Sequence, residues 1–424
     1  MLQNIIGKNV TMVNNKRPVI VISLITAICL LGDSMLYVVL PIRWQDFGLT
    51  SLWEVGVLLS VNRLIRLPLN PLIGWMYKRM SKRAGILLAV LLAVVTTASY
   101  GMAGSFWLLF IIRSVWGIAW SFLRLGGYFT IIELSDKTNR GQFMGTFNGL
   151  TGIGSLIGML AGSFAVEWFG IRNVTLVFGL AALVAVPFVL KYVSKGKTEA
   201  DHGVHVVGGE QTLKIWREPF VVWTLVSGLM TAMVFQGMYN STLSRLIQVH
   251  ESTYVQLWTL SLGAASLAGI LQAMRWGLQP WLSPWIGRRF DVAKDQSRMF
   301  VVLLVGASCL LAIVPFHMPF AVWLALLLGL QLGITAVSTV VDALATDASM
   351  RGVSKLAVMT GYTMATDLGA SLGPSIAYTL DGIVGTSSIY WCAAAVLLLL
   401  AVRWLTPFQE SHRPIRTTAL QEKK

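Results

Sequence analysis

Apolar segments long enough to cross a lipid bilayer recur along the whole of this 424-residue sequence. A helix needs about 20 apolar residues to span the hydrocarbon core, and a segment in lipid must satisfy its own backbone hydrogen bonds. The sequence is 55% hydrophobic and 12% charged, with a mean hydropathy of +0.68, which excludes a soluble domain. We therefore predict an all-α membrane protein with twelve transmembrane helices, near residues 18–41, 52–76, 84–103, 106–132, 142–166, 173–194, 218–246, 254–287, 298–316, 319–345, 354–380 and 386–407.

The sequence is also internally duplicated. Residues 63–74 (RLIRLPLNPLIG) and 275–287 (RWGLQPWLSPWIG) both begin with arginine in an apolar stretch and continue through two prolines to a glycine. Farther along, an Arg-Gly pair occurs at Arg140 and again at Arg351, 211 positions later (351 minus 140). Doubling near the midpoint predicts two six-helix bundles related by pseudo-symmetry, with the working site between them.

Glycines at four-residue spacing occur in the fifth and eleventh predicted helices, at Gly158 and Gly162 and at Gly369 and Gly373. Such small residues permit close approach of two helix backbones. They predict either packing within one bundle or a sliding contact between bundles, and the sequence leaves both open.

Basic residues crowd into alternate connections between the predicted helices, which is the pattern of cytoplasmic loops. The net charge of +14 is therefore a topology signal, and no nucleic-acid partner is expected. We expect a multi-pass protein of the plasma membrane, of the bacterial cytoplasmic type, with both termini in the cytoplasm. The predicted parts are an N-terminal tail (1–17), a first bundle (18–194), a linker (195–217), a second bundle (218–407) and a C-terminal tail (408–424).

Seven charged side chains fall inside the predicted membrane helices. A charge at the bilayer centre costs at least about 2.5–3.5 kcal/mol, so each needs a partner or a watery cavity. The predicted helices 3, 6, 9 and 12 carry none in their centres, as expected of helices that face lipid. The seven residues are Asp33, Arg63, Arg66, Arg113, Arg124, Arg275 and Asp367.

Arg63 and Arg275 are the symmetry-related pair among these charges. They precede Gly74 by 11 residues (74 minus 63) and Gly287 by 12 (287 minus 275), which places both about 16–18 Å from the loop, near the midplane. We predict that both bind substrate. The alternative is neutralisation within each bundle, of Arg63 or Arg66 by Asp33 and of Arg275 by Asp367.

The fourth predicted helix carries Arg113, Trp116, Trp120 and Arg124 at spacings of 3, 4 and 4 on one face. Guanidinium groups beside indole rings suit an anionic ligand with a flat or apolar body, although the tryptophans could instead pack against a neighbouring helix. Further predicted substrate contacts are Arg66, Tyr37, Gln236 and Asn240.

Asp33 and Asp367 are the predicted proton-coupling residues. A carboxylate that gives up an arginine partner to an anionic substrate can take up or release a proton.

Several motifs resemble those of the major facilitator superfamily of secondary transporters. The loop 74–83 (GWMYKRMSKR) is similar to its G-x-x-x-D-R-x-G-R-R signature, with Lys78 in place of the aspartate. Residues 113–117 (RSVWG) resemble its fourth-helix motif, and 369–374 (GASLGP) has a form seen in exporters. The resemblance covers essentially the whole chain and implies a secondary transporter of twelve helices, similar to the drug and metabolite exporter branch.

Charges near the cytoplasmic helix ends could form ion pairs that lock the two bundles together and then break. The alternative is that these charges simply face water and lipid headgroups. The predicted gating residues are Arg79, Arg83, Glu133, Arg140, Arg289, Asp291, Asp342 and Arg351.

No nucleophile–base pair, metal-ligand cluster or cofactor motif is present in the sequence, so we expect neither an enzyme nor a bound cofactor or metal. The expected partners are a small-molecule substrate, protons and the lipid bilayer, and we expect a monomer. The favoured function is proton-coupled, rocker-switch efflux of an anionic or zwitterionic amphipathic molecule. The alternatives are uptake of an organic anion, a sensor of transporter shape that does not transport, and a lipid flippase.

Overall fold

The computed structural model describes residues 2–134, 140–195, 218–250, 255–257, 260–351 and 355–406. These residues are almost entirely helical. The first half contains α1 (Leu2–Val39), η1 (Trp44–Phe47), α2 (Leu52–Leu64), α3 (Arg66–Arg79), α4 (Lys82–Ser99), η2 (Tyr100–Met102), α5 (Phe106–Leu134), α6 (Arg140–Leu183) and α7 (Ala185–Tyr192). The second half contains α9 (Pro219–Thr231), the π-helix η3 (Ala232–Tyr239), α10 (Asn240–His250), α11 (Ala264–Asp291), α12 (Gln296–Ile313), α13 (Phe320–Arg351), α14 (Lys355–Val384) and α15 (Thr386–Leu405).

These helices confirm the twelve predicted segments once the divided and fused ones are matched: α7 completes the sixth segment after α6, and α9, η3 and α10 together form the seventh. One segment divides into α2 and α3, because Pro68 has no N–H to donate to the carbonyl group of Leu64. Conversely, α6 runs through two segments and bends at Gly170, whose φ of 74° is costly for residues with a side chain.

One predicted end was wrong. The eighth segment, predicted from residue 254, begins as a helix only at Ala264, after an antiparallel hairpin of β1 (Val255–Leu257) and β2 (Leu260–Leu262). At the other end of the chain, α1 begins at Leu2, and its membrane-length apolar part is Arg17–Val39, close to the predicted start at residue 18.

Eight stretches of the described chain are long and apolar enough to cross a membrane by composition alone, and one of them, Thr146–Tyr192, covers two of the predicted segments. The helices α11 and α14 are not among the eight. They carry Arg275 and Asp367, whose charges lower the local hydropathy. Charge alone does not remove a helix from the eight, since α1 with Asp33 and α5 with Arg113 and Arg124 are among them.

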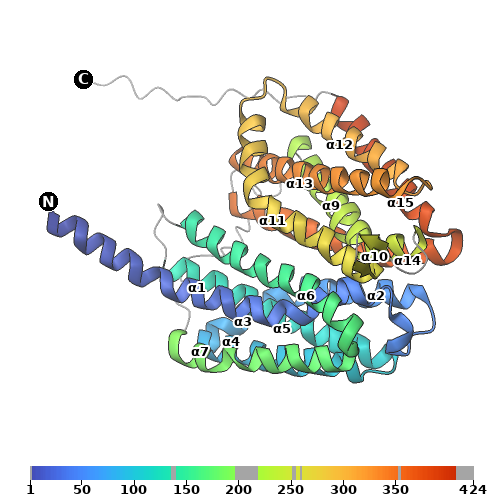
Figure 1. The fold of residues 1–424 in the computed structure, drawn as a ribbon. Coiled ribbons are helices and arrows are strands. Elements are labelled where there is room, and N and C mark those ends of the chain that lie inside the picture. The colour runs from blue at the N-terminus through green and yellow to red at the C-terminus, as the bar shows by residue number, and fades with distance from the viewer. Residues whose placement is uncertain are drawn as a thin grey trace, which may run out of the picture.

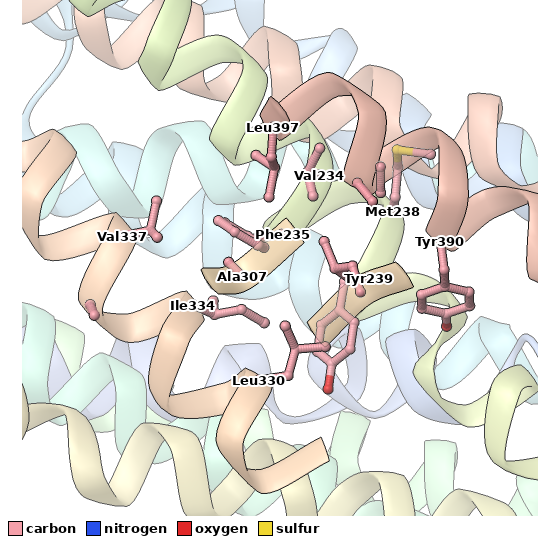
Figure 2. Close-up of a cluster of buried hydrophobic side chains, with 14 of the residues drawn as sticks. Val234, Phe235, Met238, Tyr239, Ala307, Leu330, Ile334, Val337, Tyr390 and Leu397 are labelled. Carbon is pink, nitrogen blue, oxygen red and sulfur yellow. The ribbon is translucent and has the colours of Figure 1, made fainter. Parts of the chain in front are cut away.

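The helices form two bundles, coloured blue to green and yellow-green to red in Figure 1, and the start of α1 and the end of α15, the termini of the described chain, lie toward the same end of the molecule. Each bundle has its own buried apolar core. Figure 2 shows part of the second core, where Phe235 of η3 lies near Ala307 of α12 and Ile334 of α13. This architecture confirms the predicted fold of two pseudo-symmetric bundles.

The bundles meet along a seam formed by α2 against α14 and by α6 against α11. A Cβ on Gly56 would lie 2.6 Å from the Pro374 carbonyl oxygen, and a Cβ on Gly269 would lie 2.5 Å from Ser163 Oγ. These two approaches are pseudo-equivalent, since Ser163 and Pro374 are 211 positions apart (374 minus 163). Only glycine permits backbones to come this close.

Both close approaches lie at the end of the molecule remote from the termini, since Gly56 is near the start of α2 and Gly269 near the start of α11. Toward the other end of the same two segments, a Cβ on Gly74 or on Gly287 would meet no described atom within 4 Å. The seam is thus tightest at the remote end.

The glycines that the sequence analysis identified at four-residue spacing do not contact the opposite bundle in this way. Gly158 and Gly162 of α6 lie against Leu31 and Met35 of α1, and Gly369 of α14 lies against Leu229 of α9. These contacts stay within one bundle, so the first of the two predicted interpretations applies to them.

Candidate functional site

Several of the charged residues predicted inside the membrane helices lie where the two bundles face each other. Arg63 of α2 donates from Nε to the Tyr37 hydroxyl group of α1 at 3.3 Å, and from Nη1 to Gln236 Oε1 of η3 at 3.4 Å. Its guanidinium carbon also lies 5.8 Å from the centre of the Tyr37 ring. Arg63 therefore links the first bundle to the second.

A second link between bundles is the ion pair of Arg124 on α5 with Asp367 on α14. The distance from Arg124 Nη1 to Asp367 Oδ2 is 3.4 Å, and the two side chains are 27% and 16% exposed. Arg124 Nε also donates to the Tyr128 hydroxyl group one turn later, at 3.0 Å. The pair is therefore long and only partly shielded from solvent.

Arg66 completes the cluster. Arg66 is only 7% exposed. Its Nε has no hydrogen-bond partner among the described residues. Its electrostatic neighbours are Asp367, Arg63 and Arg124. One carboxylate is thus paired with Arg124 and lies within electrostatic reach of two more guanidinium groups, and we refer to Arg63, Arg66, Arg124 and Asp367 as the seam cluster.

Asp33 is neutralised elsewhere, inside the first bundle. It forms a close ion pair with Arg113 of α5, and Asn62 Nδ2 donates to it at 3.3 Å. Arg113 is 1% exposed and also donates from Nε to the Leu58 carbonyl oxygen at 3.0 Å. The pairings considered from sequence, of Asp33 with Arg63 or Arg66 and of Asp367 with Arg275, were therefore wrong.

The four residues predicted to share one face of the fourth transmembrane helix lie in two different environments. Trp116, 1% exposed, belongs to the core of the first bundle, and Trp120 packs partly buried against that core. Only Arg124 reaches the second bundle. Both tryptophans thus pack against neighbouring helices, which was the alternative to substrate binding. Their role in binding stays a prediction.

Arg275, the pseudo-symmetry partner of Arg63, lies on α11 and is 8% exposed. Its Nη1 donates to Asn240 Oδ1 at 3.0 Å, and its guanidinium carbon lies 5.5 Å from the Trp276 ring centre. Asn240 follows Gln236 by four residues, so the two symmetry-related arginines contact successive turns of one transmembrane segment. Among the described contacts, no side chain bonds to both arginines.

Most predicted gating residues with described side chains contact groups of their own bundle. Glu133 forms an ion pair with the buried Lys82, and the Tyr362 hydroxyl group donates to Asp342 Oδ1 at 2.6 Å. The remaining described contacts are those of Arg83 Nε with the Val193 carbonyl oxygen at 2.8 Å, of Arg79 with the Trp75 ring at 3.9 Å and of Arg289 with the Trp285 ring at 4.8 Å. The side chains of Arg140, Asp291 and Arg351 lie outside the described part of the structure, so the gating roles stay predictions.

Three residues of this region were missed from the sequence. Tyr128 follows Arg124 by one helical turn, a spacing that could have revealed it. Asn62 and Glu167 carried no comparable signal, because their partners Asp33 and Ser266 are far away in the sequence. Within the described residues, no group of three or more histidine, cysteine, aspartate or glutamate side chains is placed to hold a metal ion.

Known proteins resemble this chain over different lengths. The amine transporter of chromaffin granules from Rattus norvegicus is 25% identical over 172 residues, 40% of this chain and 32% of that protein, so the chain matches about a third of its length. The multidrug resistance protein MdtG of Dickeya zeae is 20% identical over 379 residues, which cover 88% of this chain and 89% of that protein.

Solved structures share the fold. The nucleoside transporter NupG superposes with a TM-score of 0.74 at 13% sequence identity, over 92% of this chain and 98% of its own. A bacterial homologue of the human lysosomal transporter Spinster gives a TM-score of 0.70 at 13% identity, over 92% and 95% of the two chains.

The sequence model of the Major Facilitator Superfamily matches residues 22–362, most of the chain. The chain has the twelve-helix architecture, the two related bundles and the charged interior of a secondary transporter, and not those of an enzyme. This chain therefore belongs to the Major Facilitator Superfamily.

Proposed function

We propose that this transporter exports a small anionic or zwitterionic amphipathic molecule, in exchange for protons, by rocker-switch alternating access. The observation that carries the proposal is the composition of the seam cluster, in which Arg63, Arg66 and Arg124 lie within electrostatic reach of the single carboxylate of Asp367. The cluster carries a formal charge of +2 and lies between the bundles. An anion that enters between them would complete the charge balance.

Arg66 is the strongest support for an anionic ligand. A buried guanidinium group without a hydrogen-bond partner is costly in a protein interior. A carboxylate or phosphate group from a ligand would accept from its fork of N–H donors, with charge-assisted hydrogen bonds.

Asp367 supplies the proposed coupling to protons. For exchange, binding of cargo must displace a proton: the anionic group of a zwitterionic cargo would bind the arginines while its cationic group pairs with the ionised Asp367 carboxylate, so binding releases the proton that Asp367 carried. Loss of the ligand reverses the exchange. Asp33, predicted as the first proton site, is already paired with Arg113, so we assign it a secondary role in the proposal.

The basic connections support an orientation with both termini in the cytoplasm. The remote end of the seam then faces the outside, and the wider end faces the cytoplasm. In the proposal this is the state that receives cargo from the cytoplasm, and breaking the remote contacts releases the cargo.

Two resemblances bear on direction and cargo in different ways. The multidrug resistance protein matches nearly the full chain and supports export. The amine transporter suggests a cationic cargo, but a cationic site would need more carboxylates than arginines at the seam. Uptake of an organic anion is the second candidate, favoured by the same arginines.

Counterflow in proteoliposomes tests the proposal, with anionic, zwitterionic and cationic compounds that share one apolar body. We expect anions or zwitterions to exchange, and Arg63→Ala and Arg275→Ala to slow the exchange at least tenfold. Arg43→Ala, which removes an exposed arginine paired with Asp46, is the matched control and should leave transport unchanged. Exchange of cations alone, unaffected by either Arg63→Ala or Arg275→Ala, would overturn the proposed cargo class.

A further inference from the structure

A carboxylate of the first bundle caps a helix of the second. Glu167 lies near the end of the first membrane pass of α6, where α6 meets the start of α11. The backbone N–H of Ser266, in the first turn of α11, donates to Glu167 Oε1 at 3.3 Å. The contact crosses the seam between bundles at its remote end.

The helix that Glu167 contacts has no side-chain cap of its own. The N-cap residue of α11 is Gly263, and α11 has no cap hydrogen bond from its own N-cap side chain. The first N–H groups of a helix need an acceptor, and the helix dipole attracts negative charge to this end. A Cβ on Gly263 would overlap the Glu167 carboxylate, so the space beside the helix end is occupied by this group.

Glu54 provides an internal comparison at the same end of the molecule. Its carboxylate accepts from the backbone N–H groups of Thr50 at 2.7 Å and Ser51 at 3.3 Å, at the start of α2. Both carboxylates therefore satisfy donors at helix starts. Glu54 does so within one bundle, whereas Glu167 joins two bundles that must separate here when the remote end opens.

We propose that Glu167 is a positioning residue for transport, which holds the remote end closed by capping α11 from the opposite bundle. The cap fixes α11, the helix that carries Arg275, against α6. When the bundles separate, water must replace Glu167 as the acceptor for the first N–H groups of α11. Water must also hydrate the freed Glu167 carboxylate. The closed state is thereby favoured over the open one by a contact that exists only in the closed state.

Spin-label distances between the bundles test the proposal without any substrate. Spin labels on Gln45→Cys and Ile383→Cys, both exposed positions at the remote end, report the distance between the two bundles there. The native Cys29, Cys309 and Cys392 are first replaced by alanine so that only these two positions are labelled. Glu167→Ala should increase the ratio of the long-distance to the short-distance population about two- to thirtyfold, the range expected for loss of a helix cap. Glu54→Ala should lower thermal stability and leave this ratio unchanged.

A second variant examines the same contact from the other side. Gly263→Ala places a methyl group where the carboxylate now lies, so it should raise the long-distance population by itself but add nothing in the Glu167→Ala protein. Unchanged distances in Glu167→Ala, equal changes in Glu54→Ala, or additive effects of the Gly263 and Glu167 variants would each overturn the proposal. The inference rests on the alternating access of the proposed function, but an incorrect cargo class would leave these distances as expected.

Discussion

At the scale of single residues, the sequence was informative about which charges enter the membrane and uninformative about their partners. Arg63, Arg66, Arg124 and Asp367 were all named from hydropathy and helical spacing, and they do lie at the seam. Their pairings could not be read, because an ion pair between α5 and α14 joins residues 243 positions apart. Spacing along a helix indicates a face, whereas the partner depends on how other helices pack.

The buried pair of Arg113 and Asp33 gives a prediction about stability. Arg113→Leu should destabilise the protein by about 3–5 kcal/mol, because it leaves the Asp33 carboxylate buried with no countercharge. The double variant Arg113→Leu with Asp33→Asn should recover much of this loss, since no uncompensated charge remains. Thermal unfolding of the purified proteins in detergent measures both effects. Equal destabilisation of the single and double variants would contradict the role of this ion pair.

At the scale of helices, the number and approximate course of the elements followed from apolar length, and the breaks followed from proline and glycine. The start of α11 was missed because the preceding residues are as apolar as the helix itself, and only the structure separates hairpin from helix at Gly263. The close contacts of Gly56 and Gly269 were also missed. Neither glycine belongs to a four-residue repeat, and their need for a small side chain arises from the opposite bundle.

These two glycines predict how the remote end closes. Gly56→Leu should prevent close contact of α2 with α14, because even a Cβ would lie 2.6 Å from the Pro374 carbonyl oxygen. Cysteine placed at Ser375, beside this contact, should then react faster with a maleimide that cannot cross the membrane and is added from outside. As the control, Gly74→Leu should leave the rate unchanged, because no described atom lies within 4 Å of a Cβ there. Unchanged labelling in Gly56→Leu would contradict the account of the seam.

At the scale of the whole molecule, duplication organises both the fold and the site. The two bundles repeat at 211 to 212 positions, and the remote seam contains pseudo-equivalent glycine contacts on its two sides. The charges do not repeat in the same way: the seam cluster uses Arg63, Arg66 and Arg124 of the first bundle but only Asp367 of the second. Symmetry was thus a good guide to the architecture and a poor guide to the chemistry.

The proposed chemistry depends on an anionic group that binds between the bundles at the seam cluster. Equilibrium binding of the matched anionic, zwitterionic and cationic compounds to purified protein tests it most directly, in wild type, Arg66→Gln and Arg124→Gln, with Arg43→Gln as control. We expect anions to bind best, and each seam variant to weaken anion binding about ten- to a hundredfold, the loss expected for charge-assisted hydrogen bonds. Preferential binding of cations, or anion affinities unchanged in both seam variants, would contradict it.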